Sequence, residues 1–130
     1  MYLLFDIGGT KTRIAVSNDR KTIGQPKIFD TPKDFKAGVE LIAKTAKELS
    51  PGSPIKAASG GIPGPLDREK TMMINVLRFK NWNGKPFKLE LEKALGAPVY
   101  LENDAVVGGL GEAVFGAGKG KSIVVYMTIS

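Results

Sequence analysis

The amino-acid sequence predicts one domain of the α/β class. Its 130 residues match the size of a single domain, and 42% of them are hydrophobic, which is enough for a buried core. Short runs of β-favouring residues, bounded by glycine, proline or polar turns, occur near both ends of the chain and in its middle. Between these runs, apolar side chains recur at the spacing of an amphipathic helix. Strands that alternate with helices are typical of α/β domains.

The composition limits the chemistry that the chain can perform. It contains no cysteine and no histidine, so disulfides, thiolate zinc sites and a histidine base are all excluded. Its 19 Lys and Arg residues give a net charge of +6, but they are spread along the chain, so we expect no nucleic-acid partner. No export signal is visible, and no apolar run approaches the roughly 20 residues that cross a bilayer, so we expect a cytoplasmic protein without membrane contact.

The first thirty residues predict three consecutive antiparallel strands. Residues 2–7 and 12–17 are apolar runs on either side of the Gly8-Gly9 turn, in which both glycines can adopt positive φ. A third strand is expected at residues 23–29, after a second polar turn. Strands that follow one another so closely usually pair in one sheet.

The next segment predicts an amphipathic helix. Thr31 has the side chain of a helix N-cap, and Pro32 suits the first helical position. The apolar stripe of this helix, which we expect to pack on the sheet, consists of Phe35, Val39, Ile42, Ala46 and Leu49. Residues 50–54, which are rich in proline and serine, then end the helix.

The middle of the chain predicts an inner strand followed by a long excursion. Residues 55–59 are short and apolar, and they lead into the loop at 60–65, which glycine opens and proline stiffens. Residues 66–75 are expected to form either another strand pair or an extended excursion. The polar turn at 81–84 carries the single tryptophan, Trp82, which we expect in the core or as a lid over it.

The last third of the chain predicts two helices and two strands. A helix at residues 86–95 is closed by Gly96, and a brief strand follows at 99–101. The next helix, at residues 105–115, contains three glycines, which we expect to allow close packing on a neighbouring backbone. A buried strand is expected at residues 123–129.

The turn between the first two strands has the chemistry of a phosphate-binding loop. Glycine lets amide hydrogens approach an anion closely, and neighbouring hydroxyl and ammonium groups add further donors. The candidate phosphate-binding residues are Gly8, Gly9, Thr10, Lys11 and Thr12. Asp6 could orient a hydrated Mg²⁺ beside the phosphates. From these residues alone, an ordinary Gly-Gly hairpin is the alternative.

Asp104 is the candidate general base. It follows the strand at 99–101 and precedes a helix, and ligands in α/β sheets gather at the carboxyl ends of strands. A helix N-terminus favours the charged form of a carboxylate, which can then accept a proton from a substrate hydroxyl. The alternative is that Asn103 or Asp104 simply caps the helix.

Taken together, these motifs resemble those of the ROK family of bacterial and archaeal sugar kinases and repressors. The segment 6–11, the loop 60–65 and the triplet 103–105 occur in the order of the family's motifs. The resemblance implies a ribonuclease H-like, actin-like ATPase domain, which is an α/β fold with a mixed sheet, three antiparallel N-terminal strands and flanking helices. It covers the whole chain but only the first half of a typical member. Residues 1–130 are therefore expected to be an N-terminal sugar-binding lobe, with the C-terminal nucleotide lobe absent.

The resemblance also implies roles for individual residues. The family's general base matches Asp104. The implied substrate-binding residues are Asn103, Gly61, Gly64 and Asn81. The turn at residues 8–12 would hold the phosphates of ATP, with Mg²⁺ near Asp6. ATP and Mg²⁺ are therefore the expected cofactors, and no zinc site is expected in this chain.

The implied activity is ATP-dependent phosphorylation of a hexose, as in a glucokinase. One lobe cannot enclose both sugar and ATP and exclude water between them, so the chain is expected to be inactive alone. One alternative is half of a split or homodimeric kinase, and another is a non-catalytic sugar-sensing module of the repressor type. The expected partners are a hexose and either the missing lobe or a second copy of the chain, so we also expect a homo-oligomer.

Overall fold

The computed structural model describes residues 1–129 and contains one five-stranded sheet. Its strands are β1 (Tyr2–Ile7), β2 (Lys11–Ser17), β3 (Lys27–Asp30), β4 (Ala57–Ile62) and β5 (Val99–Asn103). Its helices are α1 (Phe35–Leu49), α2 (Phe87–Leu95) and α3 (Asp104–Val114), with a 3-10 turn, η1 (Leu77–Phe79), before α2. The strand order is β3-β2-β1-β4-β5, with antiparallel pairing among β1, β2 and β3 and parallel pairing of β4 with β1 and β5. The predicted mixed sheet with three antiparallel N-terminal strands is therefore confirmed.

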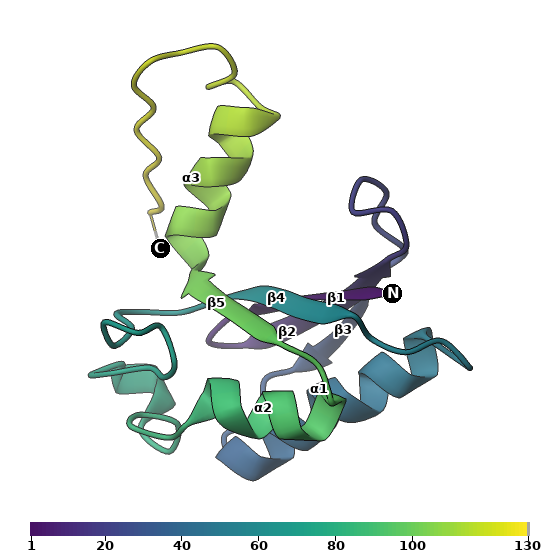
Figure 1. Cartoon of the computed structure of the whole chain (residues 1–130). Coiled ribbons are helices and arrows are strands. Elements are labelled where there is room, and N and C mark those ends of the chain that lie inside the picture. Colours follow the sequence, from purple (N-terminus) through teal and green to yellow (C-terminus); the bar gives the residue numbers. More distant parts are fainter. Residues whose placement is uncertain (130) are drawn as a thin grey trace.

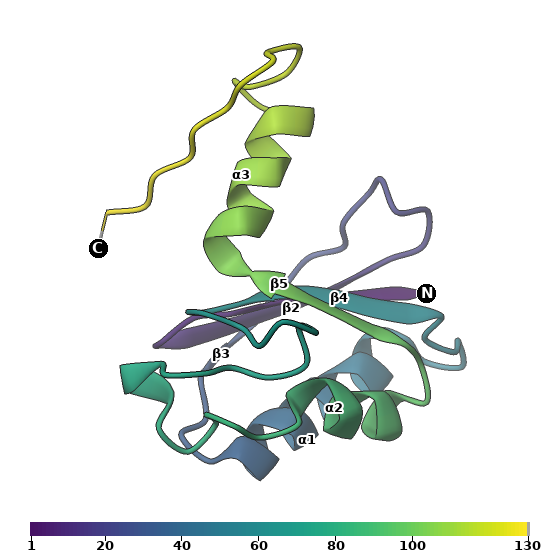
Figure 2. The same ribbon diagram turned by 60° about the vertical axis from the view of Figure 1, so that its left-hand side comes forward.

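The helices divide between the two faces of this sheet. α1 and α2 cover one face, while α3 rises from the end of β5 on the other side (Figure 1, Figure 2). Leu3, Phe5 and Ile7 of β1 face α1 and α2 and are at most 4% exposed. We call the opposite face, which carries Leu4 and Asp6 of β1, the open face. Within residues 1–129, no helix combines the length and the apolar character needed to cross a membrane.

The core joins the apolar stripe of α1 to a cluster of aromatic side chains. The fully buried positions of the stripe are Val39, Ile42 and Ala46, each at most 8% exposed. Trp82 packs edge-on against Phe35, with ring centroids 5.6 Å apart. Its indole N–H donates to the Pro32 carbonyl at 3.2 Å, so the one polar atom of the ring is satisfied. Trp82 is 2% exposed, which confirms its predicted place in the core.

The third strand begins later than predicted. It spans Lys27–Asp30 rather than residues 23–29. Asp19 accepts hydrogen bonds from the amides of Thr22 and Lys21, at 2.7 and 2.9 Å, which hold the chain in a turn up to that point. The same hydrogen bonds lower the pKa of Asp19 to about 2. The turn thus removes residues that the strand would otherwise use.

Helix α1 is capped by Asp34, so the predicted cap at Thr31 is wrong. The Asp34 carboxylate accepts from the Ala37 amide at 2.8 Å, as an N-cap side chain does. The Thr31 hydroxyl instead donates to the Gly8 carbonyl at 2.7 Å and lies 3.0 Å from the hydroxyl of Thr12. Thr31 therefore ties the first hairpin to the end of β3, which keeps it out of the helix.

Strand β4 extends into the glycines that the sequence assigns to a loop. It spans Ala57–Ile62 rather than residues 55–59. Gly60 pairs with Phe5 of β1 on one side and with Leu101 of β5 on the other, and these neighbours supply the backbone partners that keep it extended. A Cβ on Gly60 would overlap the Phe5 ring, so no larger residue fits between sheet and core.

The predicted buried strand at residues 123–129 is not formed. The segment runs back beside α3 as an extended chain (Figure 1, Figure 2), and no described strand pairs with it. Its apolar side chains are 75% or more exposed at Ile123, Val125, Met127 and Ile129. Tyr126 packs against Gly108 of α3, where a Cβ would lie 2.9 Å from the ring. The helix glycines thus make room for a side chain rather than, as predicted, for a neighbouring backbone.

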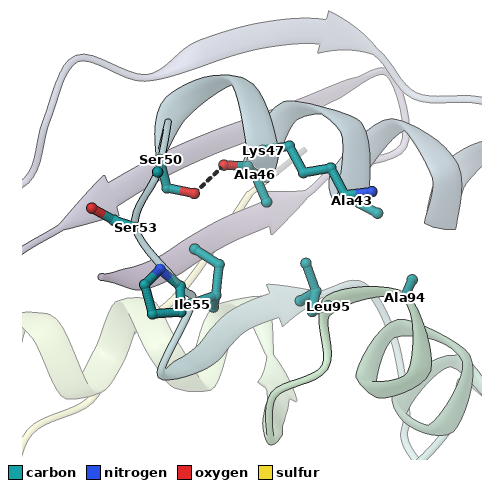
Figure 3. A pocket seen from close by; sticks show the side chains of 10 residues that line it. Ala43, Ala46, Lys47, Ser50, Ser53, Ile55, Ala94 and Leu95 are labelled. Carbon is teal, nitrogen blue, oxygen red and sulfur yellow. Dashed lines mark hydrogen bonds between the residues drawn. The ribbon is translucent and has the colours of Figure 1, made fainter.

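A small hollow lies between the C-terminal ends of α1 and α2 (Figure 3). It has a volume of about 330 Å³, and Ile55 and Leu95 are among its lining residues. At its edge the Ser50 hydroxyl donates to the Ala46 carbonyl at 2.7 Å, which satisfies the end of α1. Ile55 precedes β4 and Gly61 lies near its other end, so the hollow is about 20 Å of strand away from the carboxyl edge of the sheet.

Two helix glycines are expected to respond to the same substitution in opposite ways. A Cβ on Gly38 of α1 would overlap the buried Trp82 ring, so Gly38→Ala is expected to lower the free energy of unfolding by about 1–3 kcal/mol. Gly111 of α3 has open space around it, so Gly111→Ala is expected to raise helix stability by up to about 1 kcal/mol. Urea unfolding and far-UV circular dichroism measure both effects. A Gly38→Ala protein as stable as the wild type would contradict the close packing of α1 on Trp82.

Candidate active site

One row of residues crosses the open face at the carboxyl ends of the parallel strands. Asp6 of β1 pairs with Arg13 of β2 on one side and with Gly61 of β4 on the other, and Gly61 pairs with Glu102 of β5. Adjacent strands lie about 4.8 Å apart. The Asp6 and Glu102 positions are therefore about 10 Å apart, on either side of a position that has no side chain.

Asp104 occupies the space over Gly61. A Cβ on Gly61 would lie 3.1 Å from the Asp104 Cα, so the missing side chain lets the first residue of α3 rest on β4. Asp104 reaches this place because β5 ends at Asn103 and α3 begins at the next residue. The structure thus brings together three of the predicted site residues, Asp6, Gly61 and Asp104.

Two carboxylates of the row are paired with cations. Asp6 Oδ2 accepts from Arg13 Nη1 at 3.0 Å. Glu102 forms an ion pair with Lys70, whose hydrogen bond, together with one from the Asn103 amide, lowers the pKa of Glu102. Both carboxylates therefore already have a cationic neighbour that offsets their charge.

Asp104 differs from them because it has no cationic partner among residues 1–129. Its Oδ1 accepts only from the amide of the adjacent Ala105, at 2.8 Å, and its side chain is exposed. An accessible carboxylate without a competing cation can accept a proton from a hydroxyl that comes within hydrogen-bond reach.

Asn103, and not Asp104, is the N-cap of α3. Its Oδ1 accepts from the amides of Ala105 and Val106 at 3.0 and 3.2 Å. Its Nδ2 donates to the Gly64 carbonyl at 2.9 Å, which holds the loop after β4 against the start of α3. A carboxamide has two N–H donors, so one remains for a ligand. The cap leaves the carboxylate of Asp104 free for another role.

Asn75 joins this group although the sequence motifs do not include it. The Ile74 amide donates to the Pro65 carbonyl at 3.0 Å, which places Asn75 beside the loop that contains Gly64. Asn75 adopts a φ of 56°, in the left-handed region, which asparagine enters more readily than most residues other than glycine, and its side chain is exposed. Asn75 lies outside the motifs that the sequence analysis singles out, although its residue type suits this backbone conformation.

Residues 66–75 form an extended excursion with one isolated bridge rather than a strand pair. Asp67 fixes its turn by accepting from the amides of Thr71 and Met72 at 2.6 and 2.8 Å. Burial acts to raise the pKa of Asp67, but these hydrogen bonds outweigh it and lower the pKa. The excursion is thereby held in place, where it supplies Lys70 to the row.

The structure does not bring Asn81 to this row. Its Nδ2 donates to the Lys33 carbonyl at 3.4 Å, near the start of α1. It lines a hollow together with Lys36 of α1 and Lys80. α1 and α3 lie on opposite sides of the sheet (Figure 1). Asn81 and Asp104 therefore lie on opposite faces of the sheet. The prediction that Asn81 contacts the same ligand as Asp104 has no support in this arrangement.

The Gly8-Gly9 turn differs in detail from its sequence-based expectation. Neither glycine has a positive φ. The Gly8 amide donates to the Lys11 carbonyl at 2.8 Å and closes the hairpin, so this amide is occupied. Within residues 1–129, the amides of Gly9 and Thr10 donate no hydrogen bond, and both residues are exposed. These two amides are the donors that the turn offers to an anion.

The other two predicted phosphate ligands have partners within the fold. Thr12 is 2% exposed, and its hydroxyl faces that of Thr31 on the side of the core. The Lys11 ammonium donates to Asp30 of β3 at 2.6 Å. Both side chains thus already have a hydrogen-bond partner, whereas the Gly9 amide has none within residues 1–129.

A metal ion in this region would depend on Asp6. Among residues 1–129, no three His, Cys, Asp or Glu side chains are grouped so that they could hold a metal ion. Mg²⁺ often takes only one or two protein carboxylates and completes its shell with water and substrate phosphates. Asp6 fits that arrangement, in which it would share its charge between Arg13 and the hydrated ion.

The sequence has well-defined relatives. The model of the ROK family matches residues 2–130. The chain belongs to the ROK family. It is 36% identical to the glucokinase of Thermotoga maritima over 126 residues, and this alignment covers 95% of this chain and 40% of that protein. It is 32% identical to the N-acetyl-D-glucosamine kinase of Vibrio cholerae over 117 residues, and this alignment covers 87% of this chain and 38% of that protein. The ROK chain thus spans about 40% of the length of the curated relatives it matches.

Solved ROK structures share the fold of this chain. The ROK glucokinase of Streptomyces griseus, in complex with glucose and AMPPNP, aligns with a TM-score of 0.81 at 30% identity, over 92% of this chain and 38% of that one. The ROK hexokinase of Thermus thermophilus aligns with a TM-score of 0.80 at 32% identity, over 92% of this chain and 40% of that one. These alignments confirm the predicted actin-like ATPase fold.

Removing the Asn103 side chain is expected to loosen α3. Asn103→Ala loses the helix cap and the hydrogen bond to Gly64, so we expect the free energy of unfolding to fall by about 1–2 kcal/mol. Asn103→Asp keeps the capping oxygen and is expected to lose less. Urea titration followed by circular dichroism measures the difference. Equal stability of the alanine variant and the wild type would show that the cap does not hold α3 in solution.

The Lys70–Glu102 pair is expected to make stability depend on pH. Because the pKa of Glu102 is lowered from its usual 4.5, its contribution is present at pH 7 and is lost as the pH falls through the folded-state pKa. Glu102→Gln is therefore expected to lower stability at pH 7 by less than about 1 kcal/mol and to match the wild type at strongly acidic pH. Thermal unfolding across this pH range measures the effect, with Glu69→Gln as the control. A difference that persists unchanged in acid would argue against the ion pair.

Proposed function

We propose that this ROK chain is the N-terminal, sugar-binding lobe of a cytoplasmic, ATP-dependent hexose kinase of the glucokinase type. The observation that carries the proposal is the placement of Asp104, an accessible carboxylate without a cationic partner that rests over Gly61, one strand from Asp6. The glucokinases and N-acetyl-D-glucosamine kinases among its relatives support a hexose substrate. The relative in complex with glucose and AMPPNP supports ATP as the phosphate donor.

Asp104 would act as the general base of this reaction. Phosphoryl transfer asks the protein mainly for orientation and charge, and a carboxylate beside the attacking hydroxyl takes its proton as the bond to phosphorus forms. Asp6 and Glu102 each hold a cation, so neither competes for that proton. Mg²⁺ near Asp6 would offset the negative charge that develops on the phosphate oxygens.

The groups that would hold the sugar surround one side of Asp104. Asn103 keeps one carboxamide N–H, and the loop at Gly64, with a φ of 75°, lets its backbone approach a ring closely. Asn75 adds an exposed carboxamide next to that loop. The free Gly9 amide lies at the end of β1, beyond Asp6. A sugar hydroxyl and a phosphate held by these groups would meet beside Asp104, between it and Asp6.

A second lobe would cover the apolar surface that this chain leaves open. α3 has no fully buried residue, and Leu110 and Phe115 are 63% and 85% exposed. The open face carries a hollow of about 730 Å³, lined in part by Leu4 and Tyr100. Folded domains rarely expose apolar patches of this extent without a partner. The Thermotoga glucokinase, of which the alignment covers 40%, has a length that would include such a lobe.

Replacing Asp104 is expected to abolish phosphoryl transfer. In the protein that carries both lobes, Asp104→Asn is expected to lower kcat by about 10²- to 10⁴-fold with little change in KM, because asparagine cannot accept the proton. A coupled assay with ATP and either glucose or N-acetylglucosamine measures both constants. Glu112→Gln, on the same helix with its carboxylate bound to the Ala117 amide at 3.0 Å, is the matched control and is expected to keep wild-type kcat.

The 130-residue chain alone is expected to be inactive in the same assay, because one lobe cannot close around both substrates, and light scattering measures its oligomeric state. A dimer of this chain that phosphorylates a hexose, at a rate abolished by Asp104→Asn, would replace the two-lobe assignment with the homodimeric alternative. Wild-type kcat in the two-lobe Asp104→Asn protein would overturn the role of Asp104 as the base.

A further inference from the structure

Three cationic side chains lie near the glycine turn, Lys11, Arg13 and Arg78. The Arg78 guanidinium comes from η1 and would lie 3.8 Å from a Cβ on Gly9. Lys11 and Arg13 both belong to β2, and their side chains are about half exposed, at 51% and 54%. The Lys11 ammonium binds Asp30 of β3 at 2.6 Å, which directs it toward the edge strand. The Arg13 guanidinium binds Asp6 of β1 at 3.0 Å, which directs it toward the strand that leads into the turn. Lys11 and Arg13 are therefore held on opposite sides of β2.

Strand register places Arg13 in the same row as the candidate base. Arg13 is opposite Asp6, and Asp6 is opposite Gly61, over which Asp104 rests. Arg13 is thus two strand spacings, about 10 Å, from Gly61. A group that lies over Asp6 is then flanked by Asp104, which rests over Gly61, on one side and by the guanidinium on the other. Lys11 has no corresponding place, since its partner lies on the far side of β2 from this row.

The Arg13 guanidinium has donors to spare. One of its five N–H groups donates to Asp6 Oδ2, and no other residue within 1–129 accepts a hydrogen bond from it. A guanidinium matches two phosphate oxygens at once, which the ammonium of lysine cannot do. Because Asp6 already orients the Arg13 side chain, less conformational freedom is lost when an anion binds.

We propose that Arg13 donates hydrogen bonds to the oxygens of the phosphoryl group that is transferred, and that Lys11 does not. This assignment rests on the proposed kinase function. Asp6 holds the guanidinium from one side while the phosphate approaches from the other. The negative charge that builds on the phosphate oxygens during transfer then lies beside a cation that needs no reorganisation. Arg13 would be a phosphate ligand in addition to the Gly9 and Thr10 amides.

Titration of the 130-residue chain with tripolyphosphate in the presence of EDTA tests the assignment. Heteronuclear NMR follows the backbone amides of Gly9 and Thr10 and the side-chain Nε–H of Arg13. In the wild type we expect saturable shifts of all three signals. Arg13→Gln is expected to weaken binding about tenfold or more, because a bidentate contact between charged groups is lost. Arg13→Lys keeps the positive charge but loses the paired N–H donors of the guanidinium, so we expect a smaller loss of affinity than in Arg13→Gln.

Two further variants separate a direct contact from a general effect of charge. Arg20→Gln removes the same charge from the other end of the open face, where Arg20 lies 5.6 Å from the centre of the Tyr2 ring, and is expected to bind as the wild type does. Asp6→Asn removes both a negative charge and the side chain that orients Arg13, so it serves as a background for Arg13→Gln. If Arg13 contacts the anion directly, Arg13→Gln weakens binding in the Asp6→Asn protein as well, whereas a guanidinium that merely neutralises Asp6 predicts no loss in that background.

Several results would overturn the assignment. They are wild-type affinity in Arg13→Gln, an equal loss in Arg20→Gln, no loss from Arg13→Gln in the Asp6→Asn background, or an Arg13 Nε–H signal that stays fixed while Gly9 shifts. The absence of saturable shifts in the wild type also counts against it. None of these results concerns the proton acceptor, which hexose phosphorylation by the two-lobe protein tests separately. The assignment of Arg13 can therefore fail while the proposed kinase function stands.

Discussion

Two adjacent glycines on β4 determine where both the core and the candidate site lie. Successive residues of a strand point to opposite faces, so Gly60 leaves space under the helices and Gly61 leaves space on the open face. The Phe5 ring fills the first space, and the backbone of Asp104 fills the second. A side chain at Gly60 would separate the sheet from its aromatic core, and one at Gly61 would lift α3 away from Asp6. The packing of the core and the geometry of the candidate site thus both depend on these two glycines.

Local signals in the sequence predict those elements whose ends are determined locally. Gly96 ends α2 with a φ of 65°, and Asn103 caps α3, and both are visible in the sequence as cap residues. The extent of β4 and the segment 123–129 are not predicted, because a strand is defined by its neighbours. A glycine-rich segment becomes a strand when β1 and β5 flank it. An alternating apolar segment stays exposed when no described strand lies beside it.

The same distinction holds for the candidate site. The sequence motifs identify Asp6, Gly61 and Asp104, which the structure then brings together because each lies near the carboxyl end of one of three parallel strands. They do not identify Arg13, whose place in the row follows from the register of β2 against β1. Nor do they identify Asn75, which the hydrogen bond between Ile74 and Pro65 places beside the loop that contains Gly64. The role of each residue depends on which neighbours it meets in the fold, and its own residue type does not indicate them.

The direct passage from β5 into α3 has a mechanical consequence. α3 has 11 residues and is therefore about 16 Å long, and its first residue rests on Gly61. If the helix tilted by about 10° about that residue, its far end would travel about 3 Å while the residue itself stayed almost in place. Asp104 thus lies at the pivot point of α3. A tilt of α3 would move the residues that follow its C-terminal end and would leave the Asp104 carboxylate aligned with β4.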